Sequence, residues 1–186
     1  MRALLKMIAV LALTLGGVTI APAMAAEIST GAKMPASFKA IDATGRSRNW
    51  ASIAGKKGTV LVLFRSAKWC PYCQAQLKSL KDVQASLAQR GYSLAALSYD
   101  APDVLAGFAA KTGVDYTLLS DEKSAMIDAF GLRDPAYAPG SYAHGVPKAS
   151  ILVVDAKGVL RWKSVMTDYK IRADNATILE AVDALH

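Results

Sequence analysis

The chain contains two cysteines, Cys70 and Cys73, in the run Cys-Pro-Tyr-Cys. A pair at this spacing is a redox dithiol, a structural disulfide or half of a zinc site. A structural disulfide stabilises more as its closed loop lengthens, and this loop is very short. A structural zinc site needs four ligands, and only His144 and His186 are available to complete one. The redox dithiol is therefore the favoured interpretation, and we predict neither a metal nor a cofactor.

The surrounding sequence predicts that Cys70 is the reactive cysteine. It follows an apolar run typical of a strand, and Pro71 suits the first position of a helix. The N–H groups and positive dipole at a helix start lower a thiol pKa from about 8.5 to between about 3.5 and 7.5. Arg65 and Lys68 add positive charge nearby. We predict that Cys70 is the nucleophile and that Cys73, more buried in the first turn, is the resolving thiol.

Three further residues are candidates for substrate binding: Trp69, Val146 and Pro147. Trp69 is either a packing aromatic or an apolar rim beside the sulfur of Cys70, and its position favours the rim. Pro147 lies between a long loop and an apolar run, an order that favours a cis bond. Such a bond would expose the backbone of Val146 for pairing with an extended substrate. His144 is a local base or a loop residue, and we favour the loop residue.

The elements that position these residues follow from hydrophobic periodicity. The continuous apolar run at 59–64 predicts a central strand that is buried on both faces. Further strands are predicted at 38–41, 92–99, 117–119, 150–154 and 159–165. Helices are predicted at 51–57, from the dithiol to Gly91, from a cap at Asp100 to Gly113, from Asp121 to Gly131, and from about Asp174. Residues 132–146 show no period and form a long loop. This alternation predicts an α/β fold whose sheet carries helices on both faces.

The N-terminal residues have the three parts of a secretory signal peptide. Arg2 and Lys6 precede an apolar run at 7–20, and small residues lead up to Ala25. A membrane anchor needs roughly 20 apolar residues, and this run is shorter. We therefore predict a signal peptide at 1–25, cleavage before Ala26, and one domain at 26–186. The protein would be periplasmic or secreted, with no membrane span after cleavage.

The net charge of the 186-residue chain is +7, and it falls to +5 once Arg2 and Lys6 leave with the signal peptide. A charge of this size favours solubility and weak attraction to acidic surfaces. The sequence has no Lys/Arg run and no alternation of aromatic and basic residues. We therefore predict that nucleic acid is not a partner.

Two sets of motifs resemble known proteins. Gly55-Lys56-Lys57-Gly58, Trp69-Cys70-Pro71-Tyr72-Cys73 and Gly145-Val146-Pro147 resemble motifs of the thioredoxin superfamily. Residues 151–162 and 168–172 are similar to the peroxiredoxin-like branch of the alkyl hydroperoxide reductase and thiol-specific antioxidant (AhpC/TSA) family. The resemblance covers about 31–185. It implies a thioredoxin-like fold with a central mixed sheet and reduction of peroxides by Cys70 as the peroxidatic cysteine.

The chain departs from the peroxiredoxin pattern at three positions. Typical members carry Pro seven residues, and Thr or Ser three residues, before the peroxidatic cysteine, where this chain has Leu63 and Ala67. The entrance of the late strand, where such enzymes carry an arginine, holds Lys148. Ser66 and Arg65 are candidates to replace the missing groups.

Three functions stay open on the sequence alone. The first is reduction of peroxides, which the C-terminal resemblance favours. The second is exchange with disulfides of exported proteins, which the missing Thr favours. Both would need a thiol or disulfide protein as electron donor or acceptor. The third is a non-enzymatic binding module that uses the long loop, and the intact dithiol makes it the least favoured.

Overall fold

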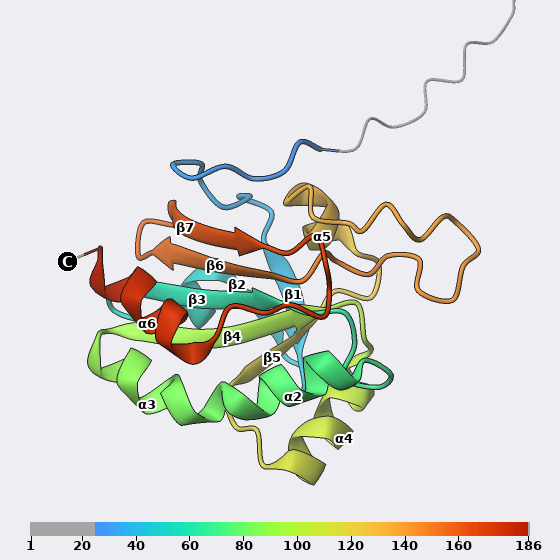
Figure 1. Cartoon of the computed structure of the whole chain (residues 1–186), viewed down its shortest axis with the longest axis horizontal. Coiled ribbons are helices and arrows are strands. Elements are labelled where there is room, and N and C mark those ends of the chain that lie inside the picture. The colour runs from blue at the N-terminus through green and yellow to red at the C-terminus, as the bar shows by residue number, and fades with distance from the viewer. Residues whose placement is uncertain (1–24, 186) are drawn as a thin grey trace, which may run out of the picture.

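The computed structural model describes residues 25–185, so the predicted signal peptide lies outside the described residues apart from Ala25. Within this part of the chain the strands form one mixed sheet in the order β2-β1-β5-β4-β3-β6-β7 (Figure 1). The strands are β1 (Lys39–Asp42), β2 (Ser47–Asn49), β3 (Gly58–Leu63), β4 (Tyr92–Ser98), β5 (Thr117–Ser120), β6 (Ser150–Asp155) and β7 (Leu160–Val165).

Strand β3 is the central strand that the apolar run predicted. It pairs in parallel with β4 and antiparallel with β6, and it is buried along its whole length. Because side chains alternate along a strand, Val60 and Val62 enter one hydrophobic core while Leu61 and Leu63 enter the other. The strand therefore ends between two packed layers, and the loop that follows it starts from a fixed point.

Helices cover both faces of the sheet, which confirms the predicted α/β fold (Figure 1). The helices are α1 (Trp50–Ile53), α2 (Pro71–Ser79), α3 (Lys81–Gln89), α4 (Pro102–Thr112), α5 (Ala125–Ala129) and α6 (Asn175–Asp183). Apolar residues of α2, α3, α4 and α6 share one core, and those of α1 and α5 share the other with the N-terminal segment. No helix within 25–185 has the length and hydropathy needed to cross a membrane.

Two elements differ from the predictions. The single helix expected after the dithiol is two helices that meet at Leu80, where the N–H of Val83 bonds to the carbonyl of Leu80 three residues earlier. Leu77, Leu80 and Val83 are buried on the same side, so the apolar pattern continues across the break and conceals it. The short edge strand β2 was not predicted, because its polar residues show no alternation.

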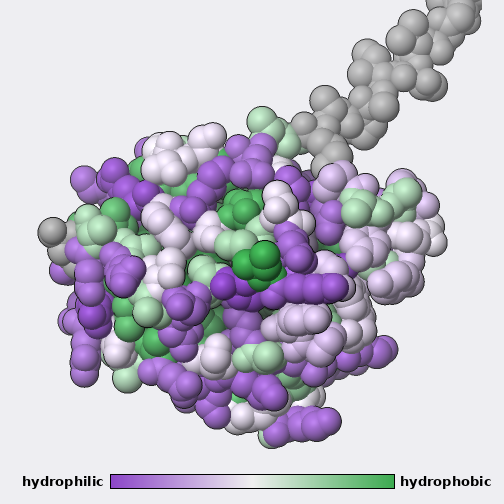
Figure 2. Space-filling model, in the orientation of Figure 1, coloured by the Kyte–Doolittle hydropathy of each residue, from purple (hydrophilic) through white to green (hydrophobic). Residues whose placement is uncertain are grey.

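The long loop at 132–146 leaves the body of the molecule as a series of turns (Figure 1). Its base is closed by backbone bonds, from the N–H of Asp134 to the carbonyl of Val146 (2.9 Å) and from the N–H of Lys148 to that of Leu132 (2.7 Å). Figure 2, in the same orientation, shows this side of the surface in pale colours that mark residues of intermediate hydropathy. The loop is therefore anchored at its base, and its middle part at 135–142 is exposed or half-buried.

Candidate functional site

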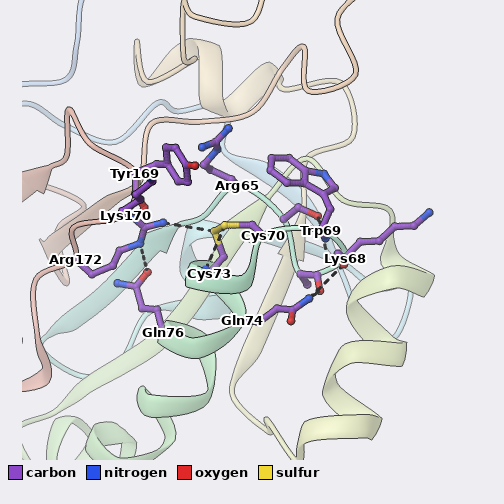
Figure 3. Close-up of a disulfide and its surroundings, with 12 residues drawn as sticks. Arg65, Lys68, Trp69, Cys70, Cys73, Gln74, Gln76, Tyr169, Lys170 and Arg172 are labelled. Atoms are coloured by element: carbon purple, nitrogen blue, oxygen red, sulfur yellow. Dashed lines mark hydrogen bonds between the residues drawn. A yellow bond between two sulfur atoms is a disulfide. The ribbon is translucent and has the colours of Figure 1, made fainter.

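The two cysteines lie at the start of α2 and form a disulfide, with Cα atoms 5.2 Å apart (Figure 3). Cys70 is the N-cap residue, Pro71 occupies the first turn, and the N–H of Cys73 donates to the Sγ of Cys70 at 3.3 Å. Both cysteines are buried, at 1% and 0% exposure, so the predicted difference in burial is absent. The helix start thus directs a backbone donor at the sulfur of Cys70, as the sequence indicated.

A buried carboxylate fixes the loop between β3 and the disulfide. Asp100 accepts hydrogen bonds from the hydroxyl of Ser66 (2.8 Å) and from the N–H of Ala67 (2.6 Å). The same hydroxyl oxygen accepts from the N–H groups of Lys68 (2.9 Å) and Trp69 (3.3 Å). Ser66 is therefore committed to holding the loop and does not supply the missing hydroxyl beside the reactive sulfur. Burial raises the pKa of Asp100, although the hydrogen bonds from Ala67 and Ser66 oppose this rise.

The role predicted for Asp100 is corrected by these contacts. We expected it to cap the following helix, but α4 begins at Pro102 and its N-cap residue, Ala101, makes no side-chain hydrogen bond. Pro102 lacks an N–H group, so this helix start has one donor fewer to satisfy. The carboxylate of Asp100 is thereby free to bind the loop before the cysteines.

Arg65 is fully buried in this loop and is surrounded by aromatic rings. Its Cζ lies 4.0 Å from the ring centre of Tyr169, 4.9 Å from that of Tyr137 and 5.2 Å from that of Trp69. It also donates to the hydroxyl of Tyr137, whereas its Nε has no hydrogen-bond partner among the described residues. Figure 3 shows Arg65 beside the disulfide. Cation–π contacts therefore hold a positive charge near the sulfur atoms.

Arg172 reaches the disulfide from the segment between β7 and α6. Its Nη2 lies 3.6 Å from the Sγ of Cys73, and its Nε donates to the Oε1 of Gln76 at 3.1 Å (Figure 3). Its Nη1 donates to the carbonyls of Tyr169 and Ile171. Burial, followed by the positive charge of Arg65, lowers the pKa of Arg172 to about 10. Arg172 therefore stays protonated at neutral pH and presents a positive charge to Cys73.

Trp69 lies next to Cys70, where the sequence placed it (Figure 3). Its indole N–H donates to the hydroxyl of Tyr99 at 3.0 Å, and its ring meets Tyr142 edge-on at 5.7 Å between centres. One edge of Trp69 is thus held by Tyr99, the residue directly after β4, and the other touches the long loop. Its role as an apolar rim for substrate stays a prediction.

Val146 and Pro147 are placed differently from the expectation. No peptide bond within 25–185 is cis, so Pro147 does not form the cis bond that the order of loop and strand favoured. Val146 is completely buried, its N–H donates to the carbonyl of Ala143 (3.1 Å), and its own carbonyl accepts from Asp134. The backbone of Val146 therefore has no free group with which to bind an extended substrate in this conformation.

The contacts of His144 are with other residues of its own loop. Its ring nitrogens lie 3.2 Å from the Nη1 of Arg133 and 3.0 Å from the carbonyl of Tyr137. Lys148, at the position where peroxiredoxins carry an arginine, contacts Glu27 at 3.4 Å. Within the described part of the chain, no three His, Cys, Asp or Glu side chains gather in a way that suits a metal ion.

The sequence did not assign a role to Arg172, Tyr169 or Tyr137. The run at 168–172 belongs to the C-terminal resemblance, which was the available signal for the first two. The spacing of the residues in this run does not reveal that the segment passes the start of α2, where Arg172 contacts Cys73. Tyr137 lies in a loop without periodicity, so only the folded chain shows that it reaches Arg65.

The geometry defines a thiol-dependent oxidoreductase, with a dithiol at a helix start after the central strand of a thioredoxin-like sheet. The sequence pattern of the AhpC/TSA family matches residues 30–163, so the chain belongs to this family. Peroxiredoxin Bcp of Escherichia coli is 30% identical over 142 residues, which are 76% of this chain and 88% of that protein.

Two further comparisons extend this result. The chloroplastic peroxiredoxin Q of Populus jackii is 28% identical over 73% of this chain and 60% of its own length. Among solved structures, peroxidoxin BcpB of Mycobacterium tuberculosis has a TM-score of 0.74 at 23% identity, and the match covers 86% of this chain and 99% of that one. The structural match supports the fold, and the sequence matches support a peroxiredoxin-like redox function.

Proposed function

We propose that this protein reduces peroxides with Cys70 as the peroxidatic cysteine and Cys73 as the resolving cysteine. The observation that carries the proposal is the disulfide at the start of an intact α2. The two sulfur atoms are bonded and α2 is folded from Pro71 onward, so the oxidised product is compatible with a folded helix. Membership of the AhpC/TSA family and the likeness to peroxiredoxins support peroxide as the oxidant.

The proposed cycle has three steps. The thiolate of Cys70 attacks one peroxide oxygen, the O–O bond breaks, Cys70 becomes a sulfenic acid, and the leaving oxygen takes a proton to form an alcohol or water. The thiolate of Cys73 then attacks the sulfur of Cys70 and displaces hydroxide, which is protonated to water. A dithiol donor finally reduces the disulfide and is itself oxidised to a disulfide.

Stopped-flow measurement of the reduced protein with hydrogen peroxide, followed by tryptophan fluorescence, tests this function. We expect a second-order rate constant at least about a thousandfold above that of a small free thiolate, because the helix start and nearby arginines stabilise the attacking charge. Cys70→Ser should abolish the fast reaction. Cys73→Ser should keep the first step and accumulate a sulfenic acid that a dimedone probe labels. A rate like that of a small thiol would refute the proposal.

Thiol–disulfide exchange with other proteins is the second candidate function. Its support is the apolar surface around the disulfide, because the exposed large hydrophobic residues among the described ones all come from segments that border it: Tyr72, Tyr142, Tyr169 and Ile171. Leu63 and Ala67 in place of the usual Pro and Thr also favour this function. A Cys73→Ser variant would hold a protein substrate as a mixed disulfide on Cys70, which non-reducing electrophoresis detects.

We also propose that the protein is exported to the periplasm or secreted. The support is the charged start, the apolar run at 7–20 and the small residues before Ala26. Fractionation of cells expressing the full chain should give a product outside the cytoplasm whose N-terminus is Ala26. A product that keeps Met1 and stays in the cytoplasm would contradict export.

A further inference from the structure

The two sulfur atoms of the disulfide have different neighbours. The Sγ of Cys70 accepts the N–H of Cys73, as expected at a helix start. The Sγ of Cys73 lies 3.6 Å from a guanidinium nitrogen of Arg172, which comes from the other end of the chain. A thiol at Cys73 would therefore meet a cation that Cys70 does not contact.

The position of Arg172 is fixed by its other contacts. Gln76, one turn further along α2, accepts from its Nε at 3.1 Å, and two backbone carbonyls of the C-terminal segment accept from its Nη1. Gln76 is itself buried. Because several acceptors hold the guanidinium, little side-chain entropy is lost when a negative charge forms beside it.

The positive charge at this site has no close carboxylate partner. Within 25–185, neither Arg65 nor Arg172 forms an ion pair with Asp or Glu. Asp168 acts on Arg172 only through a longer-range attraction, and Arg65 repels it. Lys170, two residues before Arg172, is exposed, and its Nζ lies 5.9 Å from the ring centre of Tyr169. Arg65 is buried and Arg172 is half-buried; such cations are unfavourable without a counter-charge, and a neutral disulfide supplies none.

We propose that Arg172 is a positioning residue that stabilises the thiolate of Cys73 and thereby favours the reduced form of the dithiol. This inference rests on the proposed function, since it concerns the resolving thiol. On reduction the S–S bond breaks and a donor dithiol loses two electrons and becomes a disulfide. Of its two protons, one stays on a cysteine sulfur of the pair and the other passes to solvent. The second sulfur keeps a negative charge, which Arg172 neutralises when it is on Cys73.

This arrangement has two consequences for the reaction. A thiolate at Cys73 is the form that attacks the sulfenic acid on Cys70, so Arg172 accelerates the resolving step. Stabilising the reduced form also raises the reduction potential of the pair, so that a donor dithiol reduces the disulfide more readily. Both effects arise from the same contact and should change together.

Equilibration with glutathione buffers tests the inference without any peroxide. The fraction of oxidised protein is read from electrophoresis after thiol alkylation. Arg172→Met should lower the equilibrium constant for reduction about tenfold, which corresponds to about 30 mV. Arg172→Lys keeps the charge and should retain most of the wild-type value. Lys170→Met removes an exposed positive charge two residues away and should change the constant by less than about twofold.

The thiol pKa provides an independent readout. In a Cys70→Ser background Cys73 is the remaining thiol, and its thiolate absorbance can be followed against pH. Adding Arg172→Met should raise the pKa of Cys73, while Lys170→Met should not. If Arg172→Met fails to fold, Gln76→Leu loosens the guanidinium without removing it and should shift both readouts in the same direction by a smaller amount.

An unchanged glutathione equilibrium and an unchanged pKa of Cys73 in Arg172→Met would overturn the inference. Equal effects of Arg172→Met and Lys170→Met would also overturn it, because they would show a general effect of net charge. If the wild-type protein does not reduce peroxide rapidly, the proposed function is refuted. The inference about Arg172 is then still tested separately, since the equilibrium with glutathione does not involve peroxide.

Discussion

The loop before the cysteines and the long loop at 132–146 both border the disulfide, but different interactions hold them. The first is fixed by the buried carboxylate of Asp100, which binds Ser66 and Ala67 at 2.8 and 2.6 Å. The second is anchored at its base, and its exposed Tyr142 touches Trp69 through an edge-on ring contact. Buried polar contacts thus set the position of Cys70, while exposed aromatic contacts shape its approach.

The difference matters because the two kinds of contact have different energies. A hydrogen bond to a charged, buried group is worth about 1.5–3 kcal/mol, and removing its acceptor leaves a buried donor unsatisfied. An aromatic pair adds about 0.5–1.5 kcal/mol beyond its buried area, and an exposed pair gives the smaller value. Substitutions in the first loop should therefore change stability and reactivity together, whereas those in the second should change only the range of substrates.

Removal of the carboxylate at Asp100 is expected to have the largest effect. Asp100→Ala leaves the N–H of Ala67 and the hydroxyl of Ser66 without their acceptor in a buried site. We expect the free energy of unfolding near neutral pH to fall by about 2 kcal/mol. Reaction with hydrogen peroxide should slow about tenfold, because the start of α2 loses its fixed position. Denaturant unfolding and stopped-flow fluorescence measure the two effects.

The pH dependence of this effect separates Asp100 from other groups. Burial raises the pKa of Asp100, so the folded protein binds this proton at a higher pH than the unfolded chain does. Wild-type stability therefore gains from Asp100 as the pH falls, and the loss caused by Asp100→Ala should grow from about pH 7 toward about pH 4. Asp103→Ala, at an exposed carboxylate of α4, is the matched control and should be nearly neutral. A loss that shrinks toward acid pH would show that the fold stabilises the ionised form of Asp100 and lowers its pKa, against the expected direction.

The hydrophobic pattern was sufficient to predict most of the fold. The apolar run at 59–64 identified the central strand, and Gly113 and Gly131 marked the ends of two helices, where both have positive φ. The break at Leu80 was missed because a local three-residue hydrogen bond does not disturb a buried apolar face. Periodicity reports which face is buried, and it is insensitive to a small change in helix geometry on that face.

The site was predicted only where its residues are neighbours in sequence. Cys70, Pro71 and Cys73 are neighbours in sequence, and in the structure they form the N-cap and the first turn of α2. Arg172 reaches the sulfur across 99 residues of sequence separation, and no local pattern encodes such a contact. Asp100 was assigned to a helix cap because acidic residues at such positions usually cap helices. The competing bond to a loop 33 residues earlier is visible only in the folded chain.

Truncation of Tyr142 is expected to have the smallest effect and tests the other half of the comparison. This side chain is 77% exposed and meets Trp69 and Tyr137 through ring edges at 5.7 and 6.0 Å. Tyr142→Ala should change the free energy of unfolding by no more than about 0.5 kcal/mol. The rate with hydrogen peroxide should change by less than about twofold, whereas the rate with cumene hydroperoxide, which carries an aromatic ring, should fall about threefold.

Tyr142→Phe keeps the ring and should behave like the wild-type protein with both peroxides, so it separates loss of the ring from loss of the hydroxyl. If Tyr142→Ala destabilised the fold as much as Asp100→Ala, the two loops would be held with similar strength and the contrast between them would fail. If Tyr142→Ala slowed the reactions with both peroxides equally, Tyr142 would act on the position of Cys70 through Trp69. A selective loss with the aromatic peroxide would instead place the long loop at the entrance to the disulfide, where it affects which substrates approach.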